Sequence, residues 1–271
     1  MDALVSDIRF AFRSLAKSRT FTIVSLLSLA LGIGANVTVF SLVNALAFKP
    51  LPFTEADRLV DLHEFSATKL CSGCAVGTSF PGFIDWRANA RSFSQVGAYI
   101  ERPFNISGTE NAERIGGALV SAETFPLLGV HPVLGRSFTR DDDRPGAAPV
   151  VMLGDALFAR RYGGDRRIVG QTIRVNGVSH TVIGVMPPRF RFPEFADLWV
   201  PFEPNAAGGT REQRDFGVVA RLKPGVSVGM ANEEMRVIAK SLSERYPDQK
   251  ERTAEATPFR VSEAMPGSQY A

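Results

Sequence analysis

The sequence predicts an α+β protein in which one apolar N-terminal helix precedes a water-soluble domain. Residues 21–48 contain no Asp, Glu, Lys, Arg or His, which is typical of a membrane span. The rest of the chain alternates short strand-like, hairpin-like and helix-like segments. It has no regular βαβ pattern and no internal repeat, and this favours an α+β domain.

The apolar segment 21–48 is long enough to cross a bilayer. As a helix it would measure about 42 Å, against a hydrocarbon core of about 30 Å. A cleaved signal peptide is an alternative, because Ala45-Leu46-Ala47 resembles a cleavage site, but a signal h-region has only about 7–15 residues. A buried core helix is another, although apolar core helices of this length are uncommon. We predict a transmembrane helix over 21–48.

Positive charge is concentrated before the span. Arg9, Arg13, Lys17 and Arg19 precede it, whereas only Lys49 follows it directly. Because positively charged flanks stay in the cytoplasm, we expect the N-terminus inside and the chain from about residue 49 outside the cytoplasm. The bias depends on few residues, so the opposite orientation is the alternative.

Residues 1–20 carry one apolar and one basic face at helical spacing. A helix of this kind binds at a membrane interface, with its basic residues near anionic lipid. We therefore expect a cytoplasmic amphipathic helix over 1–20, and the alternative is that the span begins early. The apolar positions are Leu4, Val5, Ile8, Phe12 and Leu15.

Small and polar residues form two neighbouring stripes along the predicted span. Small residues allow another helix to approach closely, although Gly and Ser are common in spans generally. We expect a helix-packing face whose partner helices come from outside this chain, since no second apolar run of spanning length follows residue 48. One stripe is Ser28, Gly32 and Asn36, and the other is Ala30, Gly34 and Thr38.

Two segments of the predicted domain have strong local signals. In 172–185 apolar residues alternate on both sides of Asn176-Gly177, and these two residues tolerate the positive φ angles of a type I′ turn, so we predict a β-hairpin. In 228–245 apolar residues recur at helical spacing after Ser227, a good N-cap, so we predict a helix.

The other predicted elements are shorter. Gly129 and Gly163 follow two of the helices and are expected to end them. We predict strands over 59–65, 96–107, 114–120, 149–153, 198–200, 216–222 and 254–261, and helices over 81–93, 122–128 and 155–162.

The sequence contains no motif for catalysis. It has no Gly-x-x-x-x-Gly-Lys-Ser/Thr phosphate loop and no Gly-x-Ser-x-Gly elbow. His63, His131 and His180 are widely spaced, and we expect His180 on a strand surface. The acidic run 141–143 lacks the ligand spacing of an EF-hand, so we interpret it as a solvated loop. We expect no catalytic residue, no metal and no cofactor.

Cys71 and Cys74 are the only cysteines of the chain. Outside the cytoplasm they could form a local disulfide, and free thiols are the alternative. A zinc site would need two further ligands, and His63 is the only histidine nearby. A redox centre would need a helix that starts at the first cysteine, whereas the surroundings are rich in Ser and Gly. We rank these two interpretations below the structural ones.

The charge of the chain points to no nucleic-acid partner. The net charge is only +3, and part of that excess is the N-terminal basic cluster. There is no basic stripe interleaved with aromatic residues, so we expect no nucleic-acid binding.

A series of segments, in order and at consistent spacing, resembles the MacB-type periplasmic core domain of bacterial ABC transporter permeases. This is the FtsX-like group, and the closest resemblance is to the stand-alone permeases of acidobacteria. The resemblance covers residues 1 to about 265. The segments are DIRFAFRSLAKSRTFT, LALGIGANVTVFSLVNALAFKPLPF, SFPGFIDWRANARSF, VSAETFPLLGVHPVLGRSFTRDDD, PVVMLGDALFARRYGGD, IVGQTIRVNGVSHTVIGVMPPRFRFP, LWVPF and VVARLKPGVSV.

The resemblance implies a two-lobed periplasmic core domain over 49–265. The inserted lobe would cover about 116–195, and the flanks 50–115 and 196–265 would form the membrane-proximal lobe. In this family three more spans follow the domain. The chain stops at residue 271, near where they would begin, with 266–271 as a tail. We therefore expect a permease truncated before its C-terminal spans.

The resemblance also implies a location and partners. We expect a single-pass protein of the bacterial inner membrane that takes part in efflux and transmits ATP-driven movement from a separate ATP-binding subunit to the periplasm. The other expected partners are the missing permease spans, a second copy in a homodimer, and a periplasmic protein. The alternatives are a membrane-anchored adaptor without transport activity and, least favoured, an extracytoplasmic enzyme.

Overall fold

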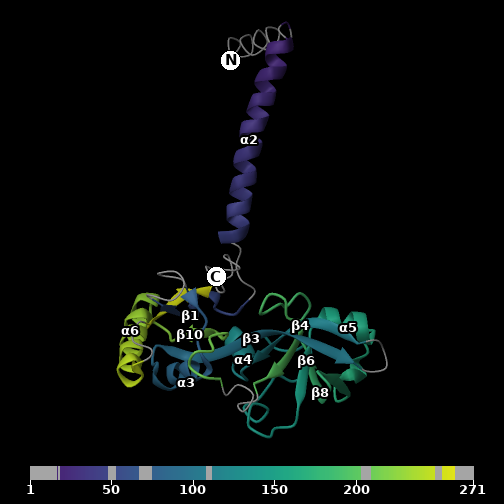
Figure 1. Ribbon diagram of the computed structural model, residues 1–271. Coiled ribbons are helices and arrows are strands. Elements are labelled where there is room, and N and C mark those ends of the chain that lie inside the picture. The colour runs from purple at the N-terminus through teal and green to yellow at the C-terminus, as the bar shows by residue number, and fades with distance from the viewer. Residues whose placement is uncertain are drawn as a thin grey trace. The chain divides into compact units, whose positions relative to one another are not determined.

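The computed structural model describes residues 17, 19–47, 53–66, 75–107, 112–202, 209–247 and 252–259. The chain divides into two compact units, residues 1–50 and 51–271, which are described separately (Figure 1). Most of the predicted amphipathic helix 1–20 and all of the tail 266–271 lie outside the described residues, so both stay predictions.

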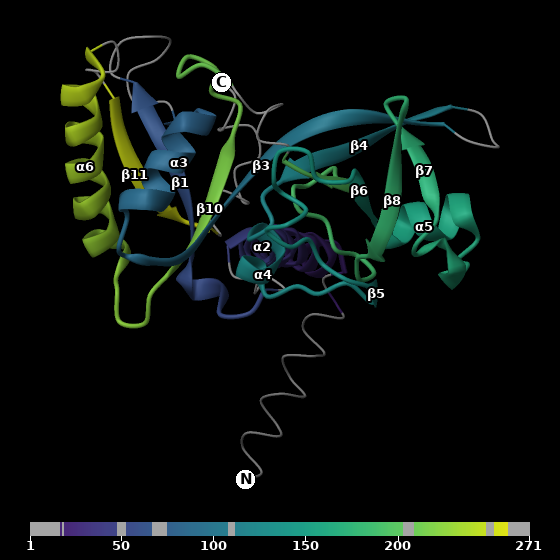
Figure 2. The same ribbon diagram turned by 90° about the horizontal axis from the view of Figure 1, so that it is seen from below.

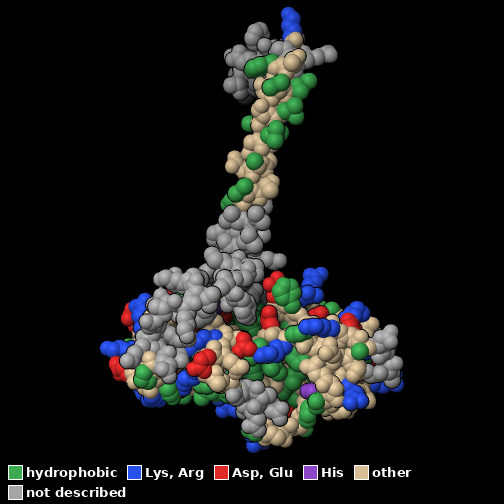
Figure 3. Space-filling view, in the orientation of Figure 1, with side chains coloured by type: hydrophobic (Ala, Val, Ile, Leu, Met, Phe, Trp, Pro, Cys, Tyr) green, Lys and Arg blue, Asp and Glu red, His purple; other side chains and the backbone are tan. Residues whose placement is uncertain are grey.

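The first unit contains one long apolar helix, α2 (Arg19–Ala47). Its stretch Thr20–Phe40 has a mean hydropathy of 2.0, and none of it is buried. Figure 3 shows hydrophobic side chains along its surface. Among the described residues, this is the one helix long and apolar enough to cross a membrane. The expected apolar helix is confirmed.

The second unit is an 11-stranded mixed sheet with helices packed on it. The strand order is β11-β1-β10-β3-β4-β9-β6-β8-β5, while β2 pairs with β1 and β7 pairs with β3 and β8. The strands are β1 (Leu59–Ser66), β2 (Ala75–Val76), β3 (Phe93–Ser107), β4 (Glu113–Val120), β5 (Leu134–Gly135), β6 (Val150–Leu153), β7 (Thr172–Val175), β8 (Val178–Val185), β9 (Leu198–Pro201), β10 (Gly217–Leu222) and β11 (Arg252–Pro258).

The helices of this unit are short except for the last. This last helix is α6 (Val228–Arg245), and its N-cap Ser227 accepts a hydrogen bond from Met230 N–H, as predicted. The side chains of α6 that face the sheet, Ala231, Met235 and Ile238, are buried. The helices are η1 (Ala56–Arg58), α3 (Phe80–Asn89), α4 (Thr124–Leu128), α5 (Asp155–Tyr162), η2 (Arg166–Ile168) and α6 (Val228–Arg245).

The predicted hairpin is formed by β7 and β8. Asn176 and Gly177 have φ angles of 50° and 81°, so both turn positions are left-handed, as a type I′ turn requires. Two parallel pairs, β4 with β9 and β6 with β8, were not predicted. The second pair is connected through α5, which gives this part of the domain a local βα crossover.

The core has three apolar clusters distributed along the long strand β3. One cluster joins α3 and α6 to β1, β10, β11 and the first half of β3. Another joins α5 to β6, β7, β8 and the second half of β3, where Phe104 and Ile106 lie. Figure 2 shows β3 running between these two groups of elements.

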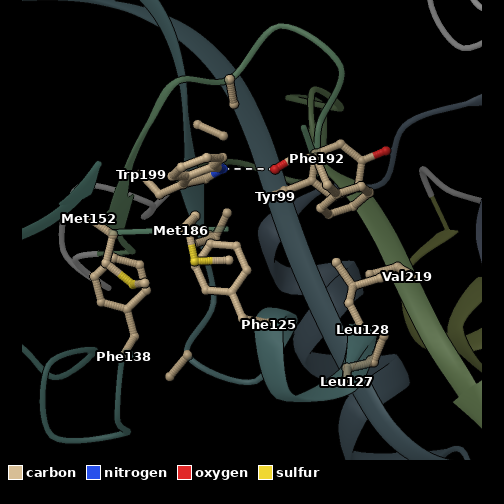
Figure 4. Packing of buried hydrophobic residues seen from close by; sticks show 14 of the residues in the cluster. Tyr99, Phe125, Leu127, Leu128, Phe138, Met152, Met186, Phe192, Trp199 and Val219 are labelled. Atoms are coloured by element: carbon tan, nitrogen blue, oxygen red, sulfur yellow. Dashed lines mark hydrogen bonds between the residues drawn. The ribbon is translucent and has the colours of Figure 1, made fainter. Parts of the chain in front are cut away.

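The third cluster lies where the two groups meet. Phe125 of α4 and Trp199 of β9 are both fully buried, with ring centroids 5.7 Å apart. Trp199 Nε1 donates to the backbone oxygen of Phe192 at 2.7 Å, so the buried indole N–H is satisfied (Figure 4). Tyr99 of β3 packs edge-on against Phe192, with centroids 4.8 Å apart.

Several predicted boundaries were wrong. The strand predicted from 96 begins at Phe93, and the helix predicted from 122 begins at Thr124. The helix predicted over 81–93 ends at Asn89, because Ala90 is extended and the next two N–H groups are taken by a side chain. Arg91 and Ser92 each donate a backbone N–H to the Glu234 carboxylate at 2.7 Å. The strand predicted over 254–261 covers Arg252–Pro258 instead, where it pairs with β1.

The expectation for His180 was also wrong. His180 is only 9% exposed. It lies opposite Ile173 in the hairpin and therefore faces the apolar cluster beside α5 that contains Ile173. Its Nδ1 lies 3.0 Å from the oxygen of Val178.

Candidate functional site: the neck segment

The site residues predicted from sequence fall into two groups with different outcomes. Cys71 and Cys74 lie outside the described residues, so their state stays a prediction. Ser28, Gly32, Asn36, Ala30, Gly34 and Thr38 all lie on α2 and are exposed. Thr38 Oγ1 donates to Gly34 O at 2.7 Å, a bond within the helix that satisfies the hydroxyl in an apolar setting. Their role in helix packing is untested.

Residues 53–58, which we call the neck segment, begin the described part of the domain and contact segments that lie far away in the sequence. Only residues 48–52 separate it from the last residue of α2. It consists of a turn, with Glu55 at φ 47°, followed by the short helix η1. Two arginines hold it to the sheet.

Arg221 of β10 binds the neck segment through backbone oxygens. The residue is 7% exposed. Its Nη2 donates to Thr54 O at 2.7 Å and to Leu127 O at 2.6 Å, and its Nη1 donates to Glu55 O at 3.2 Å. Burial lowers the pKa of the guanidinium and the Glu55 carboxylate opposes that shift; an arginine nonetheless stays charged. One buried cation therefore ties the neck segment to the end of α4.

Arg58 makes the reciprocal contact from the neck segment to the strand. Its Nε and Nη2 donate to Leu222 O at 3.0 and 2.7 Å, and its Nη1 donates to Glu55 Oε2 at 2.6 Å. Hydrogen bonds from a charged donor to a carbonyl are stronger than neutral ones. An arginine side chain from each of the two segments, the end of β10 and the neck segment, thus binds main-chain oxygens of the other.

The backbone of Gly129 also lies close to the side chain of Thr54. Gly129 ends α4 at φ 70°, and a Cβ there would lie 2.6 Å from Cβ of Thr54. Only glycine combines this conformation with the lack of a side chain. The neck segment therefore rests directly on the end of α4.

Aromatic rings join the neck segment to the end of β11 and to the loop before β9. Phe53 lies edge-on to Phe259 and to Phe192, with centroids 5.8 and 6.5 Å apart. Phe192 and Phe259 are themselves 5.7 Å apart and both are buried. The first described residue of the domain and its last are thus in one rigid cluster.

A separate ion cluster lies between α3, α6 and the end of β1. Glu64 is 8% exposed, accepts from Thr78 Oγ1 at 2.6 Å and pairs with Arg214. Burial raises the pKa of Glu64, and Arg214 and Thr78 oppose the shift. Arg211 pairs with Asp85 at 2.7 Å.

The cavity beside this cluster is small. Its volume is about 40 Å³, room for a few water molecules, and Trp86 and Leu242 form part of its wall. Drug-sized ligands occupy pockets of roughly 300–1,000 Å³. The ionisable groups here are paired with one another, Glu64 with Arg214 and Asp85 with Arg211. We treat the cluster as structural.

The acidic run 141–143 is not the solvated loop that the sequence suggested. Asp141 is exposed, but Asp142 is bound by both terminal nitrogens of Arg136 at 2.6 and 2.8 Å. Asp143 is half-buried beside Glu123, and its Oδ2 accepts from Ala122 N–H at 3.3 Å. Burial and the neighbouring Glu123 raise the pKa of Asp143 to about 6. Within the described part of the chain, no group of His, Cys, Asp and Glu could hold a metal ion.

Sequence reasoning did not find the neck segment as a site. Arg221 lies 94 residues from Leu127 and 167 from Thr54, so no local pattern connects them. The one available signal was Arg221 itself, a charged residue inside an apolar strand segment.

Comparison with known proteins identifies the family. The family model of the MacB-like periplasmic core domain matches residues 22–238. The chain belongs to this family. A curated relative, the macrolide export ATP-binding/permease protein MacB of Chromobacterium violaceum, is 31% identical over 138 residues. That match covers 50% of this chain and only 20% of the relative.

Solved structures show the same fold. The periplasmic region of MacB from Actinobacillus actinomycetemcomitans has a TM-score of 0.57 at 13% identity, over 77% of this chain and 92% of that one. The extracellular domain of the ABC-type transporter YknZ from Gram-positive bacteria has a TM-score of 0.52 at 14% identity, over 73% and 99%. The expected MacB-type α+β domain of an ABC transporter permease is confirmed.

Proposed function

We propose that this chain anchors a MacB-type domain in the bacterial inner membrane and relays ATP-driven movement to it from a separate ATP-binding subunit. The family match over residues 22–238 carries the proposal, because it includes both the apolar helix and most of the domain. The contacts of the neck segment support it, since a relay needs the first residues of the domain to be held firmly on its sheet. In this proposal the chain is one part of a permease whose other spans and second copy pack against α2.

The proposed orientation places the N-terminus in the cytoplasm and the domain in the periplasm. It is supported by the basic residues before the span. Cys71 and Cys74 provide the test, because they are the only cysteines of the chain. After reduction, a membrane-impermeant maleimide applied to intact spheroplasts should label them, and labelling only after lysis would reject this orientation.

Two of the three core clusters support the proposed division into two lobes, whereas the third contains residues of both lobes. The cluster beneath α3 and α6 draws its buried members from 60–100 and 202–256, and the cluster beside α5 draws its members from 104–198. The inserted lobe proposed at about 116–195 lies inside the second range. Limited proteolysis that releases a stable fragment near these bounds would support the division.

The relay itself is tested by co-expression with ATP-binding subunits of the ABC type from the same genome. One of these subunits should co-purify with the chain from membranes, and Arg221→Ala should weaken the effect of this chain on ATP hydrolysis without abolishing co-purification. An Arg102→Ala control removes an exposed ion pair with Asp215 and should change neither result. Absence of co-purification would favour the membrane-anchored adaptor.

A further inference from the structure

Three elements of the domain meet around two neighbouring carboxyl groups, those of Glu123 and Asp143. Glu123 directly precedes α4, and Asp143 lies in the loop 136–149 between β5 and β6. Asp143 Oδ2 accepts a hydrogen bond at 3.3 Å from the N–H of Ala122, the residue before Glu123. From α3, Arg87 Nη1 lies 3.9 Å from Glu123 Oε2. The carboxyl pair is therefore a contact between the loop and two helices.

One oxygen of each carboxyl group is buried without a hydrogen-bond donor. Among the described residues, no protein group donates to Glu123 Oε2 or to Asp143 Oδ1. The other two oxygens are bound, because Glu123 Oε1 accepts from Arg140 Nε at 3.1 Å and Asp143 Oδ2 accepts from Ala122. A buried carboxylate oxygen that has lost its hydration and gained no donor raises the free energy of the ionised form. Two ionised neighbours add their mutual repulsion.

The two carboxyl groups differ in their cationic partners. Glu123 forms ion pairs with Arg140 and Arg87, and these favour its ionised form. For Asp143, burial is the largest influence, and it raises the pKa to about 6 together with the charge of Glu123, although Ala122 N–H and Arg87 oppose the shift. Asp143 is therefore the member of the pair that takes up a proton first as the pH falls.

The neighbouring charged residues of the loop have partners of their own. Asp142 is bound by both terminal nitrogens of Arg136 at 2.6 and 2.8 Å, and Asp141 forms an exposed pair with Arg144 at 3.0 Å. The Asp142 charge also raises the pKa of Asp143 slightly, as the weakest of the listed influences on that group. These contacts hold the first part of the loop, so the part that leads to β6 depends most on the carboxyl pair.

We propose that Glu123 and Asp143 form an acid-sensitive latch, which fastens the loop 136–149 to the start of α4 when Asp143 is protonated and loosens it when both groups are ionised. Because the folded state raises the pKa of Asp143, the latch is closed below about pH 6 and opens as the pH rises above it. A proton is favoured over a divalent cation, since the described part of the chain has no group of three side chains that could hold a metal ion. The inference does not depend on the proposed relay.

The test is hydrogen exchange on the full chain in nanodiscs at pH 5 and pH 8, with each rate divided by that of an unstructured reference at the same pH. Ala122 N–H reports on the latch because it donates to Asp143 Oδ2. Its protection should fall about tenfold between the two pH values, as a pKa raised from 3.8 to about 6 requires. Asn176 N–H, which donates to Asn105 O in the hairpin, is the reference and should keep its protection.

Three variants identify the group that titrates. Asp143→Asn is neutral at every pH and keeps an amide oxygen for Ala122 N–H, so the protection of Ala122 at pH 8 should stay at the level of pH 5. Glu123→Gln removes the neighbouring charge and should shrink the pH dependence. Asp141→Asn is the control and should behave like the native chain, because Asp141 is in an exposed pair with Arg144.

Four results would overturn the inference. The protection of Ala122 in the native chain could be equal at the two pH values, or Asp143→Asn could retain the native pH dependence. A parallel fall at Asn176 would show that the whole domain loosens. Protection at pH 8 that Ca²⁺ restores and a chelator removes would assign the pair to a cation. All of these leave co-purification with an ATP-binding subunit untouched, so the proposed function is tested separately.

Discussion

Arg221 is buried and the side chain of Arg214 is only 11% exposed, yet the two arginines bind different kinds of partner. Arg214 pairs with the side chain of Glu64, one carboxylate on a neighbouring strand. Arg221 binds main-chain oxygens of Thr54, Glu55 and Leu127, which come from two separate segments. The pair of Arg214 and Glu64 neutralises a charge inside the domain. The hydrogen bonds of Arg221 instead connect the main chain of the neck segment to the main chain of α4.

We expect the two sites to differ in what they support: Arg214 the stability of the domain, and Arg221 the proposed relay of movement. Losing a side-chain partner leaves a buried charge, but it moves no segment relative to another. Losing the cation at Arg221 releases the neck segment from the end of α4. Substitutions at the two sites should therefore differ in where their effects appear as well as in size.

The largest expected effect is at the ion pair. Glu64→Ala leaves the guanidinium of Arg214 buried without its carboxylate, and this should lower the free energy of unfolding by about 3 kcal/mol. Thermal unfolding in detergent measures it, followed by the emission of the two buried tryptophans, of which Trp86 lies beside the cluster. Glu64→Gln should be milder, since its amide oxygen still accepts from Thr78. Equal stability of Glu64→Ala and the native chain would show that the pair is solvated.

A smaller loss is expected at the neck segment. Arg221→Ala removes several charged hydrogen bonds and leaves the carbonyl of Leu127 without its cation, which should cost about 2 kcal/mol. The same unfolding measurement applies, with Arg102→Ala expected within about 0.5 kcal/mol of the native chain because that ion pair is exposed. A cost at Arg221 no larger than at Arg102 would remove the energetic basis of this contact.

The smallest effect on stability is expected at Asp143, a half-buried carboxyl group that accepts a hydrogen bond from the backbone N–H of Ala122. Burial raises the pKa of Asp143 from 3.8 to about 6, so folding favours its protonated form. The stability that protonation contributes is fully present below about pH 4 and is lost as the pH rises through about 6. Asp143→Asn should therefore be more stable than the native chain at pH 7.5, by about 1 kcal/mol after allowance for solvent screening.

The control for that pH dependence is the neighbouring Asp141. Asp141→Asn alters only an exposed pair with Arg144 and should show no stabilisation at neutral pH. If Asp143→Asn gives the same profile as Asp141→Asn between pH 4 and 8, the raised pKa is wrong.

Local signals were enough to predict much of the fold. Asn176-Gly177 and Ser227 each act on their immediate neighbours, so the hairpin and α6 could be placed within a residue or so. The end of α3 could not, because Glu234 from a distant helix takes the N–H groups of Arg91 and Ser92. The neck segment could not be predicted for the same reason, since all its anchors lie far away in sequence.

The most direct test of the relay is hydrogen exchange on the full chain in nanodiscs. If Arg221 ties the neck segment to α4, Arg221→Ala should speed exchange together at Arg58 N–H, which donates to Glu55 O, and at Gly129 and Val130, which cap α4. Glu64→Ala should leave these amides protected despite its larger cost in stability. Faster exchange confined to β10 in Arg221→Ala, or equal exchange at these three amides in both variants, would contradict the account.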